Sequence, residues 1–415
     1  SILARTPDDW DITTSAKPEE VKKLFRRTVD TGLQHGTVTV LLGNDGYEVT
    51  TYRLDGEYED SRHPKEVTFT SSLEEDLKRR DFTINAMAYN QEEGLVDLFG
   101  GMRDLQGKVI RAVGEPKERF TEDALRIMRA VRFSAQLGFT IDEKTYEALA
   151  ELSPNLKHIS AERIQVELVK ILTSKHPEYL EAAWETGITR VILPEFDAMM
   201  ETAQNTPHHC YDVGRHALVS LMAVPADKVL RLTMLLHDVG KPVVRTTDEQ
   251  GQDHFKGHED VGERMASEIL KRLKMDNDTI SKVCRLIHWH DYQPVAVEKG
   301  IRRAVNRVGE DIFPFLLQVQ LADTMAKSDF GREKRLEQIT KTQQIYEGIL
   351  EANQCLSLKS LAVTGKDLIA MGMQPGKGIG QMLDFLLEKV LDEPDYNKKE
   401  YLLSLAKRRL ESQSR

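Results

Sequence analysis

The stretch Arg5-Thr-Pro-Asp-Asp-Trp-Asp-Ile-Thr-Thr-Ser-Ala16 places two carboxylates, Asp9 and Asp11, on either side of a tryptophan. On an extended strand, residues two positions apart point to the same face, so both carboxylates can bind the same one or two divalent cations. Ligation by oxygen alone suits Mg²⁺, and paired cations of this kind stabilise the attacking and leaving oxygens in phosphoryl or nucleotidyl transfer. An Asp-x-Asp beside a proline is more often a solvated turn, so the neighbouring motifs decide.

A predicted hairpin supplies a third carboxylate. Residues 37–42 and 47–52 read as strands, and the turn signal Gly43-Asn-Asp-Gly46 separates them. Glu48 lies on the second of these strands. Beside the two aspartates it would complete a metal-binding triad and could accept a proton from an attacking hydroxyl. The alternative is a glutamate on an edge strand that faces water.

The segments that follow are basic and then helical. In the run Asp76-Leu-Lys-Arg-Arg-Asp-Phe-Thr-Ile-Asn-Ala86, Arg80 is a candidate phosphate contact because a guanidinium binds phosphate through a planar fork. A surface ion-pair cluster is the alternative. From about Phe120 the pattern is helical almost to the end, with a predicted helix start at 121–124 and a helix over 124–137. The outline is an α/β head followed by a long helical body.

Composition limits the partners and the compartment. At 415 residues the chain is too long for one core and predicts two to four domains. A net charge of −10 argues against indiscriminate polyanion binding, although RNA can still bind where Lys and Arg gather. We expect no membrane span, and three scattered cysteines fit reduced thiols in a cytoplasm. The chain begins with Ser1 inside a motif, so we expect upstream residues to be missing.

Six motifs occur in the order found in the bacterial class II tRNA nucleotidyltransferases, the CCA-adding enzymes, and the chain resembles that family over most of residues 5–195 and again near Gly365. The resemblance implies CCA addition to tRNA from CTP and ATP without a nucleic-acid template, with Mg²⁺ in the head. The family's Gly-rich turn and arginine, which hold the triphosphate, would precede the first residue here. The motifs are Asp9-Trp-Asp-Ile-Thr-Thr-Ser-Ala16, His35-Gly-Thr37, the Glu48 strand, Arg79-Arg-Asp-Phe-Thr-Ile-Asn-Ala86, Asp97-Leu-Phe-Gly-Gly-Met-Arg-Asp-Leu105 and Glu122-Asp-Ala-Leu-Arg126.

Two residues of the last motif suggest how bases are selected. Asp123 and Arg126 are three apart on the predicted helix, so we expect their side chains to share a face. A carboxylate accepts and a guanidinium donates, which fits the amino group and the acceptor nitrogen that C and A present side by side, and mismatches U and G. The resemblance assigns a templating role to this pair and puts Arg129 and Arg132 at the nucleotide. The alternative is a salt bridge within the helix.

A second motif group lies in a His-rich segment. His237 and Asp238 stand in Leu235-Leu-His-Asp-Val-Gly-Lys-Pro242, which resembles the HD-domain metal phosphohydrolases. The resemblance implies that His216, His237, Asp238 and Asp323 bind a transition metal, for which Ni²⁺, Mn²⁺ or Co²⁺ is suited. It also implies a phosphatase or 2′,3′-cyclic phosphodiesterase activity, in which His237 and Asp238 are catalytic. Side chains that could add a second ion are His258 and one of His288 or His290.

We therefore predict an α/β nucleotidyltransferase head, N-terminally truncated, followed by a mostly α-helical neck, an HD domain and a tail. A bacterial poly(A) polymerase shares the head and is the nearest alternative. A signalling HD phosphohydrolase with an inactive RNA-binding head is another, although the retained carboxylates favour catalysis. The oligomeric state is not predicted. The predicted boundaries are 1–115 for the head, 116–204 for the neck with the templating helix, 205–332 for the HD domain and 333–415 for the tRNA-binding tail.

Overall fold

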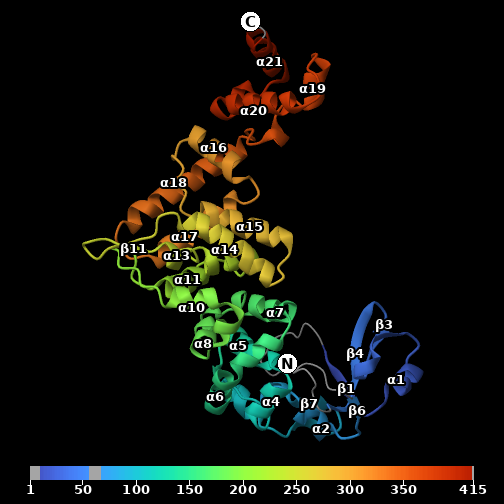
Figure 1. Ribbon diagram of the computed structural model, residues 1–415. Coiled ribbons are helices and arrows are strands. Elements are labelled where there is room, and N and C mark those ends of the chain that lie inside the picture. Colours follow the sequence, from blue (N-terminus) through green and yellow to red (C-terminus); the bar gives the residue numbers. More distant parts are fainter. Residues whose placement is uncertain (1–9, 56–66, 414–415) are drawn as a thin grey trace. The chain divides into compact units, whose positions relative to one another are not determined.

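The computed structural model describes residues 10–55 and 67–413, and the chain divides into two compact units. Unit 1 extends to Asp197 and includes Arg272–Lys274, and unit 2 consists of Ala198–Lys271 and the residues from Met275 onward. Figure 1 shows a head that contains strands in unit 1 and helices through most of the remaining chain. Asp9 lies outside the described residues.

The sheet of the head confirms the predicted hairpin. Within it, β3 and β4 pair antiparallel, and the pair Leu42–Asp45 closes the turn. Gly43 has a φ of +66°, which a glycine adopts without strain. The first strand, β1, pairs with β4 in parallel. The strand order is β1-β4-β3-β2, with β1 at Ile12–Thr14, β2 at Thr28–Gly32, β3 at Thr37–Leu42 and β4 at Asp45–Thr51.

Side-chain alternation explains why these strands form. Val38 and Val40 on β3 are buried, and Thr37 and Thr39, which alternate with them, point to the other, less buried face, as expected for a sheet covered on one face. Helix α1 (Pro18–Leu24) covers that face, where Val21 joins Val40 and Val49 in a small core. The remaining elements of the head are β5 (Arg53–Asp55), β6 (Val67–Phe69), α2 (Leu73–Lys78), β7 (Met87–Asn90), β8 (Gly94–Asp97), α3 (Gly101–Gly107) and β9 (Val109–Ile110).

The helical part of unit 1 differs from the prediction at its start. Residues 121–124 do not begin a helix, because α4 (Pro116–Glu122) ends there and α5 (Leu125–Leu137) begins after a break. The predicted end is confirmed: Gly138 has a φ of +71° and caps α5 in the left-handed conformation. The elements that follow are β10 (Thr140–Ile141), α6 (Glu143–Leu152), α7 (Ala161–Leu172), α8 (Leu180–Glu185), α9 (Ile188–Ile192) and α10 (Pro194–Met200), the last of which crosses into unit 2.

Unit 2 is built almost entirely of helices, joined by one short hairpin between β11 and β12. Buried aliphatic side chains such as Leu232, Leu286 and Leu316 form its interior. The elements are α11 (Val213–Met222), α12 (Lys228–Leu236), α13 (Lys241–Val244), β11 (Thr246–Thr247), β12 (Asp253–His254), α14 (His258–Arg272), α15 (Asn277–Trp289), α16 (Glu298–Val308), α17 (Phe313–Ala326) and α18 (Arg332–Glu351).

The C-terminal part of unit 2 has a core of its own, in which Leu368, Leu386 and Leu402 are fully buried. Arg302 on α16 ties this part to the rest of the unit by donating to the main-chain oxygen of Leu391 at 2.8 Å. Among the described residues, no helix is both long and apolar enough to cross a membrane. The helices of this part are α19 (Gly365–Ala370), α20 (Lys377–Asp392) and α21 (Lys399–Gln413).

Candidate active sites

Two of the three predicted head carboxylates occupy neighbouring backbone positions. Ile12 on β1 pairs with Val49 on β4, so Asp11 and Glu48 each precede one member of that pair on adjacent parallel strands. Val49 faces the core, and therefore Glu48 on the same strand faces the opposite side. Asp11, which directly precedes β1, and Glu48 are both exposed. Neighbouring strands are roughly 5 Å apart, so the two side chains begin close enough for their oxygens to reach one cation, and ligation by oxygen suits Mg²⁺.

Arg80 follows α2 and stays accessible at one edge. Its Nη2 lies 3.4 Å from Oδ2 of Asp76, while Nη2 of Arg79 lies 2.7 Å from the other oxygen of the same carboxylate. Asp76 is fully buried and so holds both guanidinium groups in place. The side chain of Arg80 is 27% exposed, which leaves donors available for an anion.

Asp123 and Arg126 do not share a helix face, so this prediction is wrong. Asp123 lies in the break between α4 and α5, where its Oδ1 accepts from the main-chain N–H of Leu125 at 3.0 Å. Its ion-pair partner is Arg163 on α7, at 2.9 Å. Arg126 instead donates to Glu122 at 2.7 Å. Arg163 could not be identified from the sequence, because it is 40 residues away from Asp123.

Arg129 and Arg132 lie on α5 but differ in accessibility. Arg129 donates to Oδ2 of Asp81 at 2.7 Å and is 34% exposed. Arg132 is 10% exposed, and its Nε lies 2.6 Å from Oε2 of buried Glu167. Burial lowers the pKa of Arg132, and Glu167 offsets part of that effect. Arg132 therefore fixes α5 against α7, while Arg129 retains a face toward solvent.

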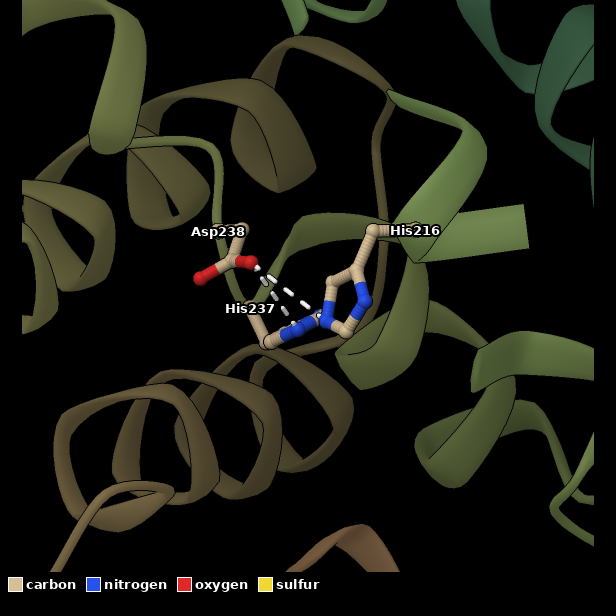
Figure 2. A group of neighbouring side chains, drawn as sticks. All are labelled: His216, His237 and Asp238. Atoms are coloured by element: carbon tan, nitrogen blue, oxygen red, sulfur yellow. Dashed lines mark ion pairs between the residues drawn. The ribbon is translucent and has the colours of Figure 1, made fainter. Parts of the chain in front are cut away.

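The predicted His-rich site is brought together in unit 2. His216 lies on α11, His237 and Asp238 follow α12, and Asp323 lies on α17, all of them buried. Figure 2 shows His216, His237 and Asp238 pointing toward one another. Oδ2 of Asp238 is 3.3 Å from Nε2 of His237 and 3.7 Å from Nε2 of His216, and Oδ1 of Asp323 is 3.0 Å from Nε2 of His216.

A second group shares Asp238. Nε2 of His258 lies 3.2 Å from Nε2 of His290, and these atoms are 3.5 and 3.8 Å from Oδ1 of Asp238. The two oxygens of Asp238 thus face different histidine pairs, an arrangement that suits two neighbouring cations. His288 does not belong to this group, because it faces the carboxylates of Asp260 and Glu263 nearer the surface.

Main-chain carbonyls orient all four buried rings. In each ring Nδ1 faces a carbonyl oxygen, which can only accept a hydrogen bond, so Nδ1 carries the proton. A neutral ring then presents the lone pair of Nε2 to the centre, as metal-binding histidines do. Nε2 of His237 is buried and makes no hydrogen bond, so the donor set fits a cation. The Nδ1 contacts are His216 to Ala326 at 3.4 Å, His237 to Met234 at 2.8 Å, His258 to Phe255 at 2.9 Å and His290 to Ile287 at 2.6 Å.

The electrostatics of the cluster keep its carboxylates ionised. Burial raises the pKa of Asp238 and of Asp323, but nearby histidine and lysine side chains outweigh burial and hold both pKa values well below the usual range. Burial lowers the pKa of His237, yet the two carboxylates raise it to about 10. For His216 and His290 burial prevails, and the pKa is lowered. The cluster thus combines two charged carboxylates with neutral His216 and His290, whereas the carboxylates favour the charged form of His237, so a cation that binds its Nε2 would displace a proton.

Two lysines of this site were missed in the sequence. Nζ of Lys241 is 2.7 Å from Oδ2 of Asp238, and Nζ of Lys327 is 2.6 Å from Oδ2 of Asp323. Each lysine follows its carboxylate by three or four residues, which is the spacing of side chains that meet on a helix. That spacing could have identified both once the two aspartates were singled out.

Three family models match the chain. One described as poly A polymerase head domain matches residues 1–111, and one described as probable RNA and SrmB-binding site of polymerase A matches residues 138–200. A third, described as tRNA nucleotidyltransferase domain 2 (putative), matches residues 258–406. The first lies in unit 1, the second lies there except for residues 198–200, and most of the third lies in unit 2.

Known proteins are similar along nearly the whole chain. A CCA-adding enzyme of Enterococcus faecalis is 36% identical over 98% of this chain and 89% of its own length, and one of Bacillus subtilis is 35% identical over 97% and 90%. A crystal structure of the Bacillus stearothermophilus CCA-adding enzyme in complex with CTP superposes with a TM-score of 0.69 at 27% identity, covering 100% of this chain and 91% of that one. On this similarity, the chain belongs to the family of CCA-adding enzymes.

Proposed function

We propose that the protein adds C, C and A to the 3′ end of tRNA from CTP and ATP, without a nucleic-acid template. The observation that carries this proposal is the 36% identity to a CCA-adding enzyme over 98% of the chain. A poly(A) polymerase remains the nearest alternative, because a model of its head matches residues 1–111. Similarity along both units favours CCA addition.

The head carboxylates would perform the transfer. Mg²⁺ ions, when bound, stabilise charge on the attacking and leaving oxygens. Asp9 and Asp11 would hold them, and Glu48 would accept the proton of the tRNA 3′-hydroxyl. The 3′ oxygen then bonds to the α-phosphorus of the nucleotide while the bond to the β-phosphate oxygen breaks and pyrophosphate leaves. Arg80, whose guanidinium is held at one edge by Asp76, would contact the phosphates.

Base selection would depend on the break between α4 and α5. Asp123 accepts and Arg126 donates, which matches the edges of C and A and leaves polar groups unpaired against U and G. A carboxylate has about four acceptor positions, so Asp123 can hold Arg163 and a base at once. Arg126 would exchange Glu122 for the base. We assign Arg129 to contact with the nucleotide and Arg132 to positioning of α5.

Product sequencing tests this function. The full chain is incubated with tRNA trimmed of its last three nucleotides, all four nucleoside triphosphates and Mg²⁺. We expect products that end in CCA and stop there. A long A tract would instead identify a poly(A) polymerase, and unextended tRNA would reject both polymerase functions.

We also propose that unit 2 is a metal-dependent phosphohydrolase of the HD type, acting on phosphate or 2′,3′-cyclic phosphate ends. The convergence of four imidazole Nε2 atoms on two buried carboxylates supports this proposal. A transition metal such as Ni²⁺, Mn²⁺ or Co²⁺, when bound, would activate water at neutral pH. In the reaction, a water oxygen bonds to phosphorus, one P–O bond to ribose breaks, and the released ribose oxygen takes a proton.

Substitution of one ligand separates the two activities. We expect His237→Ala to abolish Ni²⁺-dependent hydrolysis of adenosine 2′,3′-cyclic phosphate and to weaken Ni²⁺ binding measured by calorimetry, while CMP incorporation into tRNA persists. His288→Ala is the matched control, since His288 lies outside the cluster. Loss of both activities in His237→Ala would argue against independent sites. Hydrolysis without any nucleotide incorporation by the unaltered protein would favour the signalling phosphohydrolase with an inactive head.

A further inference from the structure

A cavity of about 530 Å³ lies over the histidine cluster, within unit 2. Asp238, His258, His290 and Asp323 line one side of it, so a molecule in the cavity would reach the ligands of the proposed metal site. Part of its wall comes from the turn after α17 and the first turns of α18, which neither motif group predicted. Cationic side chains that line the cavity are Lys241, Lys327, Arg332, Lys334 and Arg335.

Among these cations Arg335 is distinctive because it is partly buried and has no anionic partner. Lys241 and Lys327 pair with carboxylates of the cluster, and Arg332 pairs with Asp329 at 2.8 Å. Within the described part of the chain, the guanidinium of Arg335 makes no hydrogen bond or ion pair. Burial lowers the pKa of Arg335, an effect that Asp291 and Asp323 only partly offset. A partly desolvated guanidinium gains most from a bound anion, and phosphate matches its planar fork.

The same wall presents an exposed aromatic ring. Phe330 lines the cavity together with these cations and is 61% exposed. The ring of His208 supports it edge-on, with centroids 4.9 Å apart. An exposed ring beside cations is the arrangement that binds a nucleobase by stacking while its phosphate is held electrostatically.

We propose that Arg335 and Phe330 form the substrate-binding wall of this cavity, with Arg335 holding the phosphoryl oxygens of a nucleoside phosphate and Phe330 stacking on its base. This assignment rests on the proposed hydrolase function, and it names the residues that select the substrate rather than those that bind the metal. Arg335 would orient the phosphorus toward the cluster, and Phe330 would favour phosphate esters that carry a base.

Binding measurements test each residue without relying on turnover. Calorimetry with the full chain measures the affinity for inorganic phosphate and the affinity for adenosine 2′-phosphate. A lost charge-assisted hydrogen bond predicts that Arg335→Gln weakens both by at least about tenfold, and Arg335→Lys should recover part of the loss. Because a stacking contact is lost, Phe330→Leu should lower the affinity for adenosine 2′-phosphate by about fivefold or more. The affinity for inorganic phosphate should not change. Arg264→Gln is the matched control, because Arg264 is exposed on α14 and lies outside the cavity lining.

Hydrolysis assays then separate the possible outcomes. With Ni²⁺ present, Arg335→Gln should lower kcat/KM for adenosine 2′,3′-cyclic phosphate. The same loss on tRNA that ends in a cyclic phosphate would show that an RNA end is also a substrate. Binding without hydrolysis in the unaltered protein would reject the hydrolase and keep the binding wall. Unchanged phosphate affinity in Arg335→Gln, with an unaltered circular dichroism spectrum, would overturn the assignment of Arg335, as would failure of the unaltered protein to bind phosphate.

Discussion

Replacement of Arg163 by glutamine should relax the choice of nucleotide. Arg163 donates to both carboxylate oxygens of Asp123, at 2.9 and 3.4 Å, and so fixes the plane of the carboxylate that we propose reads the base edge. Without the guanidinium, Asp123 retains only its contact to the main-chain N–H of Leu125 and can rotate. When the carboxylate rotates, C and A lose a hydrogen bond, whereas U and G, which do not match it, lose none.

The magnitude follows from the contact lengths. Only the 2.9 Å contact has the length of a strong charge-assisted hydrogen bond. Such a bond contributes about 1.5–3 kcal/mol. The side chains of Arg163 and Asp123 are 25% and 19% exposed, so solvent screening favours the lower end, about 1.5 kcal/mol. Because about 1.4 kcal/mol corresponds to a factor of ten, the preference for CTP over UTP should fall about tenfold.

Single-nucleotide incorporation measures this preference. The ratio of kcat/KM for CTP to that for UTP is determined on tRNA trimmed of its last three nucleotides, for the unaltered protein and for Arg163→Gln. Arg190→Gln is the control. Arg190 is also in unit 1, but its side chain is 74% exposed, and its Nε lies as far as 3.8 Å from Oδ1 of Asp197. A ratio in Arg163→Gln that stays within about twofold of the unaltered value would refute the reasoning.

Two further substitutions test the head and its support. Glu48→Gln should lower kcat for CMP incorporation by about 10²-fold or more, because it removes the proposed proton acceptor. The control Asp45→Asn, on the same strand, should leave kcat unchanged. If steady-state assays gave the same kcat for Glu48→Gln and the unaltered protein, Glu48 would have no part in the reaction. Glu167→Gln leaves the guanidinium of Arg132 buried without a counter-charge, so the free energy of unfolding should fall by about 3 kcal/mol. Urea unfolding checks this against Glu162→Gln, an exposed position on the same helix, and no difference between the two would contradict a structural role for Arg132.

Local patterns predicted the parts of the fold that local forces determine. The hairpin was foreseen because β-branched alternation and a Gly-Asn turn specify it within the short segment 37–51. The break at Asp123 was not foreseen, because acids and an alanine after Thr121 also suit a helix start. In the structure the break is held by contacts from outside the segment, above all by Arg163 on α7. No local pattern carries that information.

In the candidate site of unit 2, likewise, some residues could be predicted from the sequence and others depended on the packing of distant segments. Four buried residues of the cluster could be singled out in the sequence, because His216, His237, Asp238 and Asp323 resemble the HD-domain pattern in spacing and context. The sequence could not decide between His288 and His290. Both lie near the end of α15, and only packing buries His290. Arg335 was invisible for a different reason. An arginine on a charged helix face has no sequence signature until the cavity beside it is known.

Two lysines explain how unit 2 can keep the buried carboxylates of this cluster charged. The carboxylates of Asp238 and Asp323 are only 2% and 6% exposed, and an unpaired charge at such depth costs several kcal/mol. Lys241 and Lys327 supply the opposite charge from three and four residues further along the chain, so the compensation forms together with the local backbone. A cation bound by the same oxygens would compete with these ammonium groups, whose flexible stems let them turn toward an anion in the cavity. The charges of the cluster are therefore compensated by the lysines alone, so we expect that removal of a bound cation would leave this domain folded.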